Sequence, residues 1–273
     1  MMRCKPLLGT YVEISIKDEC KYLKQRKLNA ALDAAFFAIA TVQQLMAFHN
    51  PFSELSKINQ EAQFKTLTIH PWTYQLLCTA KEVHRISNGV FDCGVGAKLV
   101  AEGLLPSHGP RLNITWGGLA DLILLGRYQV RSLKPLRLDL GGIAKGFAVD
   151  KAVEALQASG ITSGSVNAGG DLRIFGCQAQ EIQLRRPSKP TQLIPLGKLV
   201  DGSIASSSDY GNAATSHIIN PLTGLSVLLR ASYSVIAEKC VYADALTKVL
   251  AITQNEAHPC FQYFSATPLC IAA

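Results

Sequence analysis

The sequence lacks the features that would place it in several specialised classes of protein. None of its eight cysteines forms a CxxC pair, and their wide spacing argues against a zinc knuckle or a compact disulfide framework. Charged residues make up only 17% of the chain, against 48% hydrophobic residues, so disorder is not expected to dominate. There is no internal repeat and no low-complexity tract. The 273 residues suffice to bury a core, as one large domain or as two lobes.

The net charge of +7 is scattered along the chain rather than concentrated in one segment. No basic run with interleaved aromatic residues is present, and no zinc-finger or RNA-binding signature, which argues against nucleic acid as a partner. Two interpretations of the charge stay open, a solvated basic surface and an attraction for anionic ligands such as nucleotides. Several cysteines lie in apolar runs, as free thiols of a core do, and a reducing compartment is the simpler inference.

The opening residues, MMRCKPLLGTYVEISI, lead almost directly into an alternating strand pattern and leave no room for a secretory leader. By inspection, no run reaches the length of a membrane-spanning helix. We therefore expect a cytoplasmic protein without a membrane span, or a periplasmic one if a leader has been removed from this sequence.

Periodicity predicts helices and strands in mixed order. Helical spacing is found at 28–48, 71–87, 146–158 and 241–253, and residues 53–59 read as a short capped helix or a turn. Strand patterns occur at 10–16, 67–71, 136–140, 181–186, 193–200, 203–206 and 232–237, with short strands within 112–138, a turn-rich piece at 206–212 and a final strand or two in the tail. This order favours an α+β or mixed α/β protein, in which helices flank the sheets, over a strictly alternating one.

Residues 137–176 form the stretch with the densest signals for a ligand. A predicted strand meets a double glycine and Lys145, a helix follows, and a second strand leads into another glycine turn. Glycine turns at a helix start let the backbone approach a phosphate, and a lysine supplies positive charge. The glycine spacing matches neither GxxxxGK[ST] nor GxGxxG. On local chemistry, a ligand role and a plain turn with an exposed lysine both stay open.

Two further places offer chemistry. Asp244 and Thr247 lie three apart on a predicted helix, so both oxygens could face one Mg²⁺ ion, although Asp244 is equally typical of a first helical turn. His217 lies in a polar turn and is a candidate general base, although single histidines often have structural roles.

Taken together and in this order, these segments resemble the flavin transferase (ApbE) family, the Mg²⁺-dependent FAD:protein FMN transferases. The resemblance covers essentially the whole chain. The matching segments are LGT at 8–10, SELSKIN at 53–59, GVFD at 89–92, LDLGGIAKGFAVD at 138–150, NAGGD at 167–171, SHIINPLTG at 216–224 and ADAL at 243–246.

The resemblance implies an α+β fold of mixed sheets flanked by helices, ApbE-like and similar to the T-fold, as a single domain over 1–273 or as two lobes with the FAD site between them. It implies transfer of FMN from FAD to a Ser or Thr hydroxyl of an acceptor flavoprotein, with release of AMP. Hydrolysis of FAD to FMN and AMP at the same site, and FAD binding without catalysis, are the alternatives.

The resemblance also implies roles for individual residues. His217 is the base that takes the proton of the acceptor hydroxyl. The carbonyl of Gly142 and the carboxylate of Asp244 hold Mg²⁺. FAD is contacted by Leu8, His49, Val90, Phe91, Asp92, Asp139, Lys145 and Ile218.

Three positions depart from the family pattern. His49 stands where the family usually has Tyr, and Asn220 replaces an Asp. The second metal ligand on the last helix is expected four residues after Asp244, where this chain has Lys248, whose ammonium has no lone pair for a metal. Either Thr247 replaces the missing ligand, which is the hypothesis adopted here, or Lys248 itself supplies the positive charge.

Overall fold

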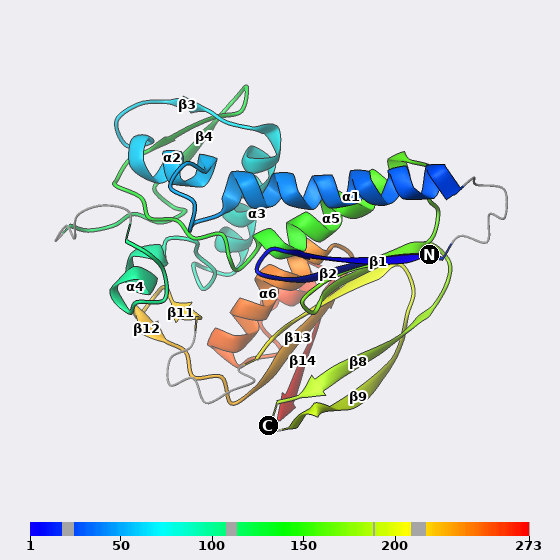
Figure 1. The fold of residues 1–273 in the computed structure, drawn as a ribbon. Helices are drawn as coiled ribbons and strands as arrows, with labels where there is room; N and C mark the ends of the chain where they lie inside the picture. Colours follow the sequence, from blue (N-terminus) through cyan, green and yellow to red (C-terminus); the bar gives the residue numbers. More distant parts are fainter. Residues whose placement is uncertain (18–24, 108–113, 188, 209–216, 273) are drawn as a thin grey trace. The chain divides into compact units, whose positions relative to one another are not determined.

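A computed structural model describes residues 1–17, 25–107, 114–187, 189–208 and 217–272. The chain divides into two compact units. Unit 1 comprises Met1–Gln43, Lys145–Ala213 and Leu229–Ala273, and unit 2 comprises Gln44–Ala144 and Ala214–Leu228. The mixed α+β class predicted from the sequence is confirmed, because strands and helices alternate irregularly along the chain (Figure 1).

Unit 1 is built on a seven-stranded sheet in which every neighbouring pair is antiparallel. In spatial order its strands are β1 (Met2–Leu7), β2 (Thr10–Ile16), β6 (Gly164–Ala168), β7 (Asp171–Phe175), β10 (Gly202–Ser207), β13 (Ala231–Ala237) and β14 (Thr267–Ala272). The same unit contains the hairpin of β8 (Gln180–Arg186) and β9 (Lys189–Leu199), the helices α5 (Ala144–Ala158, from Lys145), α6 (Cys240–Thr253) and α7 (Pro259–Tyr263), and α1 (Gln25–Met46) up to Gln43.

Side chains on the two faces of this sheet pack against different elements. Successive residues of a strand point to opposite faces, so one strand serves two layers. Ile204 of β10 belongs to a buried cluster with Ile182 and Leu184 of the β8–β9 hairpin. Its neighbour Ala205 belongs to a different cluster with Ala243 of α6. The small alanine side chains allow α6 to approach the sheet closely.

The start of α6 is joined to α5 by hydrogen bonds that run in both directions. Asp150 of α5 accepts from the backbone N–H groups of Cys240 and Val241, at 2.9 Å each. In return, Asp244 of α6 accepts from the backbone N–H of Gly146 at 3.0 Å. The first N–H groups of a helix have no partner within the helix, so each helix caps the other.

The helix α1 differs from one expectation of the sequence. In the described part of the chain it is the one helix long and apolar enough to cross a membrane by length and composition, so the prediction that no run reaches that length is wrong. In the folded chain 39% of its apolar window is buried, and both core helices of soluble proteins and signal sequences near the N-terminus meet the same criterion. Its buried stripe includes Leu32, Ala35, Ile39 and Val42, which is the spacing predicted.

Unit 2 contains short elements around its own core. Its helices are α2 (Glu54–Glu61), α3 (Pro71–Ile86) and α4 (Gly96–Ala101), and its strands are β3 (Leu67–Thr68), β4 (Leu122–Leu125), β5 (Gln129–Ser132), β11 (Ile219–Asn220) and β12 (Leu225–Ser226). The short capped helix predicted at 53–59 is confirmed as α2, because the Ser53 hydroxyl accepts from Ser56 N at 3.1 Å. The predicted end of α3 is confirmed by Asn88 and Gly89, both with positive φ.

The strand predicted at 136–140 is wrong. Within 136–140 only Leu136 takes part in β pairing, as an isolated bridge to Gly117. The side chain of Asn59 replaces a neighbouring strand here, since its amide donates to Leu138 O at 2.9 Å and accepts from Leu138 N at 2.8 Å. Asp139 N donates to Cys93 O at 2.8 Å. The segment is therefore extended and hydrogen-bonded without belonging to a sheet.

The tail contains a helix that the sequence did not predict. The tail was expected to form a final strand or two, and β14 confirms one, but α7 precedes it. His258 and Pro259 start α7, with His258 Nδ1 accepting from Cys260 N. Most of the turn-rich piece predicted at 206–212 lies outside the described residues.

We expect Gly146→Ala to destabilise the protein. A Cβ at this position would lie 2.8 Å from Asp244 Cβ and closer still to the carbonyl oxygen of Cys240, so α5 and α6 would have to separate. Overpacking of this kind costs about 1–3 kcal/mol in the free energy of unfolding, which urea unfolding measures. Gly126→Ala is the matched control, because nothing lies within 4 Å of its Cβ position. Equal stability of the two variants would contradict the close contact.

Candidate functional site

Four charged side chains gather in unit 1, where α5 and α6 begin beside the sheet. They are Lys145 in the first turn of α5, Asp171 at the start of β7, and Asp244 and Lys248 one turn apart on α6. Lys145 Nζ donates to Asp171 Oδ2 at 2.8 Å. We call these four residues the charge cluster.

Both carboxylate oxygens of Asp244 are engaged by groups of this chain. Oδ2 accepts from the backbone N–H of Gly146 at 3.0 Å, and Oδ1 accepts from Lys248 Nζ. The same ammonium also donates to the carbonyl oxygen of Asp244 at 3.1 Å. Residues four apart lie on the same face of a helix, so α6 itself holds Lys248 over Asp244.

The charges shift the pKa values of the cluster in different directions. Burial raises the pKa of Asp171 to about 6, with the charge of Asp244 adding to the effect and Lys145 opposing it. Burial also acts to raise the pKa of Asp244, but Lys248 and Lys145 outweigh it and the net direction is downward. The pKa of Lys145 is raised despite desolvation, because Asp171 and Asp244 stabilise its charge. The four side chains form two ion pairs, Lys145 with Asp171 and Lys248 with Asp244.

Exposure separates the two kinds of charge in the cluster. The side chains of Asp171 and Asp244 are 2% and 0% exposed, whereas those of Lys145 and Lys248 are 34% and 18% exposed. The carboxylates are therefore buried beneath the ammonium groups. What the cluster presents to solvent is positive charge, which suits an anionic ligand.

The hydroxyl of Thr247, predicted as a metal ligand, is directed to other partners. It donates to the carbonyl oxygen of Asp244 at 2.7 Å. Ser207 Oγ lies 2.8 Å from Thr247 Oγ1 and, because the Thr247 proton is already committed, donates to that hydroxyl oxygen. Thr247 is fully buried. Its oxygen thus has two hydrogen bonds and no contact with the Asp244 carboxylate.

The residues present do not fit Mg²⁺ in this arrangement. The carboxylate of Asp244 is occupied by an ammonium and a backbone N–H, and Thr247 Oγ1 is used elsewhere. Gly142 belongs to unit 2, in the turn before α5. Over the described ranges, no group of three or more His, Cys, Asp or Glu side chains is arranged to hold a metal ion. The predicted ligand set, Gly142, Asp244 and Thr247, stays a prediction that these contacts do not favour.

Leu8, a predicted FAD contact, occupies an uncommon backbone conformation in unit 1. It forms the two-residue turn between β1 and β2 with Gly9, and their φ angles are 56° and 72°. Such a turn usually has Asn or Gly at the first position, and a leucine there is strained. Gln43 Oε1 accepts from Leu8 N at 2.6 Å and holds the turn. The FAD contact of Leu8 stays a prediction.

Asp92 of unit 2 is surrounded by hydrogen-bond donors from its own unit. Its carboxylate accepts from Gly94 N at 2.7 Å and from Leu119 N at 3.0 Å, and His84 Nδ1 lies 3.2 Å from Oδ2. His84 Nδ1 is also 2.9 Å from the carbonyl oxygen of Phe91. Val90 and Phe91, predicted with Asp92 to contact FAD, are buried. In this structure the three residues support the core of unit 2, and their FAD contacts stay predictions.

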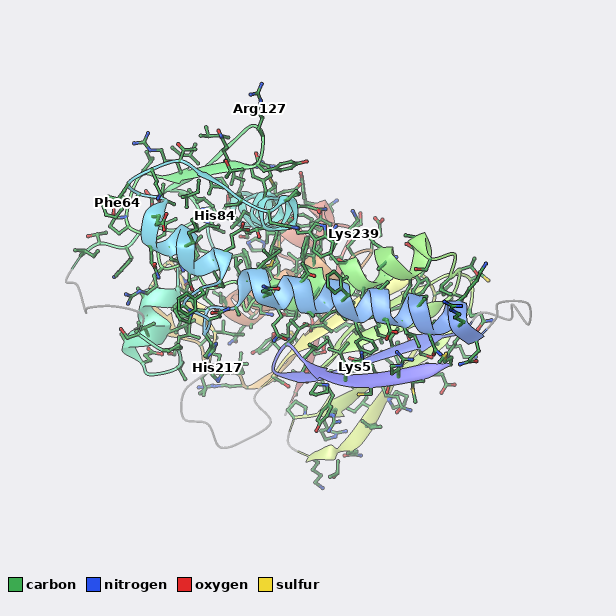
Figure 2. The ribbon with its side chains drawn as sticks, turned by 45° about the horizontal axis from the view of Figure 1, so that its top comes forward. Lys5, Phe64, His84, Arg127, His217 and Lys239 are labelled. Carbon is green, nitrogen blue, oxygen red and sulfur yellow. The ribbon has the colours of Figure 1, made fainter. Side chains whose placement is uncertain are left out.

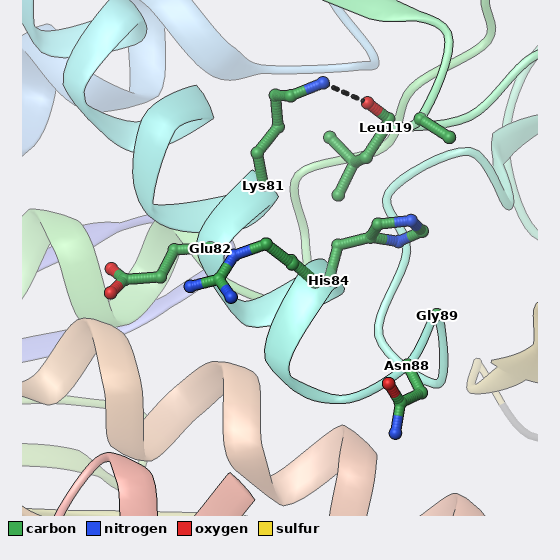
Figure 3. A pocket seen from close by; sticks show the side chains of 8 residues that line it. Lys81, Glu82, His84, Asn88, Gly89 and Leu119 are labelled. Atoms are coloured by element: carbon green, nitrogen blue, oxygen red, sulfur yellow. Dashed lines mark hydrogen bonds between the residues drawn. The ribbon is translucent and has the colours of Figure 1, made fainter.

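A pocket of about 550 Å³ opens beside His84 (Figure 3). The Lys81 ammonium at its wall donates to Leu119 O at 2.7 Å, and desolvation lowers the pKa of this lysine. The residues that line the pocket are Lys81, Glu82, His84, Arg85, Asn88, Gly89, Leu119 and Ala120. None of them was predicted as a site residue, although the predicted run 90–92 directly follows Gly89.

The other predicted residues of unit 2 lie in turns and loops. His49 and His217 are exposed, and Figure 2 labels His217. Ile218 is partly buried and directly precedes β11. Asp139 is partly buried, in the segment that Asn59 and Cys93 hold by its backbone. Their roles toward a ligand stay predictions.

Sequence reasoning did not assign roles to Asp171 and Asp150, and it treated Lys248 only as a departure. Asp171 ends the NAGGD segment and Asp150 ends LDLGGIAKGFAVD, so both motifs contained the signal. Asp171 is 1% exposed and pairs with Lys145, and Asp150 caps α6. Each residue is an acidic side chain at the end of a glycine-rich motif, and that position was the signal in the sequence. A carboxylate that becomes buried needs a cation or N–H donors as partners.

We expect the pKa of His84 to fall toward its ordinary value in Asp92→Asn. The side-chain hydrogen bond to Asp92 is the main cause that raises this pKa, against the opposing effect of desolvation. A raised histidine pKa contributes stability below the unfolded value of about 6.5 and loses that contribution as pH rises through the folded value. NMR titration of the imidazole measures the shift, with histidines remote from Asp92 as internal references. An unchanged His84 titration would rule out the pairing.

Comparison with known proteins gives a consistent result. Residues 8–262 match the ApbE family. The FAD:protein FMN transferase of Vibrio cholerae is 27% identical, covering 92% of this chain and 80% of the relative, and that of Chlamydia muridarum is 30% identical, covering 77% and 71%. The solved structure of the flavin transferase ApbE from Vibrio cholerae superposes with a TM-score of 0.82 at 24% identity, covering all of this chain and 93% of that one, and so confirms the predicted fold. The chain therefore belongs to the ApbE family.

Proposed function

We propose that this protein transfers FMN from FAD to a Ser or Thr hydroxyl of an acceptor protein and releases AMP. The observation that carries the proposal is the match to the family over residues 8–262, together with relatives named FAD:protein FMN transferases that align with most of the chain. The charge cluster supports it, because its exposed groups are ammoniums and FAD carries an anionic diphosphate.

In the proposed reaction, the acceptor oxygen attacks the phosphorus of the FMN half. A new bond forms between that oxygen and phosphorus, and the bond from phosphorus to the oxygen bridging to AMP breaks. AMP leaves with that oxygen and its electron pair, and the hydroxyl proton passes to Nδ1 or Nε2 of His217. Negative charge grows on the departing phosphate, so nearby cations lower the barrier.

Lys145 is the residue of unit 1 that we assign to the diphosphate. It is held by the buried carboxylate of Asp171 and still exposes 34% of its side chain, so it can meet an anion without giving up its partner. Its raised pKa keeps it charged throughout the neutral range. The Mg²⁺-dependence implied by the resemblance is not part of this proposal, because the residues present do not fit the ion.

An assay with three outcomes separates the candidate functions. The protein is incubated with FAD in an extract of the source organism, and the products are analysed by in-gel flavin fluorescence and nucleotide chromatography. We expect a fluorescent band together with AMP, and mass spectrometry should place FMN on a Ser or Thr. Free FMN and AMP without a labelled protein would indicate the pyrophosphatase alternative. Bound FAD that stays intact would indicate a binding protein, and both results contradict the transferase.

We expect His217→Ala to lower the rate of flavinylation by about 10²–10⁴-fold, the usual contribution of a general base. FAD affinity, measured by quenching of flavin fluorescence, should change little, because the imidazole is assigned to the acceptor proton. His258→Ala is the matched control, since it removes an imidazole that caps α7 and has no assigned part in the chemistry. Transfer at the normal rate by His217→Ala would remove His217 from the mechanism.

A further inference from the structure

We propose that Lys248 is the resident cation of the charge cluster and stands in for a divalent metal, so that the protein works without Mg²⁺. The consequence of this inference for catalysis rests on the proposed function. Its structural basis is the position of one ammonium group over the Asp244 carboxylate.

The first argument is that Lys248 already occupies the place over the Asp244 carboxylate where a metal would bind. Mg²⁺ requires near-octahedral oxygen ligands and is usually held in proteins by one or two carboxylates. Asp244 gives Oδ1 to Lys248 and Oδ2 to the backbone N–H of Gly146. A metal at Oδ1 would have to displace Lys248, which also donates to the carbonyl oxygen of Asp244.

The second argument is the balance of charge. In the cluster two ammonium groups face two carboxylates, so the group is neutral as it stands. A divalent cation at Asp244 would lie beside the Lys248 ammonium and share one carboxylate with it, so the two cations would repel each other. The ion pair that is present therefore disfavours a metal at this carboxylate.

The third argument is the direction of exposure. Lys248 keeps 18% of its side chain exposed while Asp244 is fully buried, so the cation lies on the solvent side of the carboxylate. A metal ion bound to Asp244 would have to occupy that side as well. Lys248 is tethered to α6 and cannot be removed by a chelator, which gives the proposal a simple experimental signature.

The experiment compares release of AMP from FAD, in the same extract as above, in excess EDTA and in Mg²⁺. For the natural protein we expect rates within about twofold of each other, since no step requires a free cation. Lys248→Thr places a hydroxyl four residues after Asp244. This variant should lose activity at least about tenfold in EDTA and recover it in Mg²⁺. Lys248→Arg retains a cation and should stay insensitive to EDTA.

Lys239→Thr is the matched control, because Lys239 is exposed just before α6 and its side chain has no part in the cluster. It should behave like the natural protein in both buffers. Loss of natural activity in EDTA, restored by Mg²⁺, would overturn the proposal while leaving the transferase function intact.

A second measurement does not depend on activity. Mn²⁺ serves as the probe, and its binding to the protein with FAD present is followed by electron paramagnetic resonance. We expect no stoichiometric binding by the natural protein and one ion bound by Lys248→Thr. Stoichiometric Mn²⁺ binding by the natural protein would overturn the proposal. If no variant releases AMP under any condition, the proposed function fails, and Mn²⁺ binding alone decides the role of Lys248.

Discussion

The reciprocal capping of α5 and α6 is the interaction on which the candidate site depends. Asp150 binds the first N–H groups of α6, and Asp244 binds an N–H in the first turn of α5. A carboxylate at a helix N-terminus is stabilised by the unpaired N–H groups and by the helix dipole. Gly146 makes the arrangement possible, because any side chain there would collide with α6. The two helix starts are thus fixed to each other by hydrogen bonds at buried or partly buried positions.

This junction determines how the charges are arranged. Since Asp244 is committed to Gly146, its other oxygen lies under the next turn of α6, where Lys248 reaches it. Lys145 precedes Gly146 and therefore projects beside the same junction, where it meets Asp171 at the start of β7. The turn before β7 is held by Gly170 N, which donates to Asn167 Oδ1 at 2.9 Å. Capping thus fixes the carboxylate of Asp244, and the pairing of β6 with β7 fixes Asp171.

Helices and strands in which hydrophobic residues recur at a regular spacing could be predicted from the sequence. Segments that are held in place by a single side chain could not. The helices α1, α3, α5 and α6 and the strands β2, β10 and β13 follow from periodicity, whereas β1 and β7 were not predicted. The segment 136–140 alternates like a strand, but its backbone is bound by the side chain of Asn59, which lies far away in the sequence. Motifs located Lys145 and Asp244. The partner of Thr247 could not be predicted, because it depends on Ser207 of a strand that packs against α6.

The substitution of a tethered ammonium for a metal changes what the fold must provide. A divalent ion brings two charges to one point and adjusts its position to the ligand, whereas Lys145 and Lys248 bring one charge each from two different helices. Lys248 supplies one of the two charges that a divalent ion would bring, and it lies near Lys145 only while the hydrogen bonds between α5 and α6 hold the two helices together. The position of the positive charge therefore depends on how α5 and α6 pack, instead of on how a metal is coordinated. Because electrostatic stabilisation depends on preorganised charges, loosening the junction at Gly146 or Asp150 would weaken catalysis as well as stability.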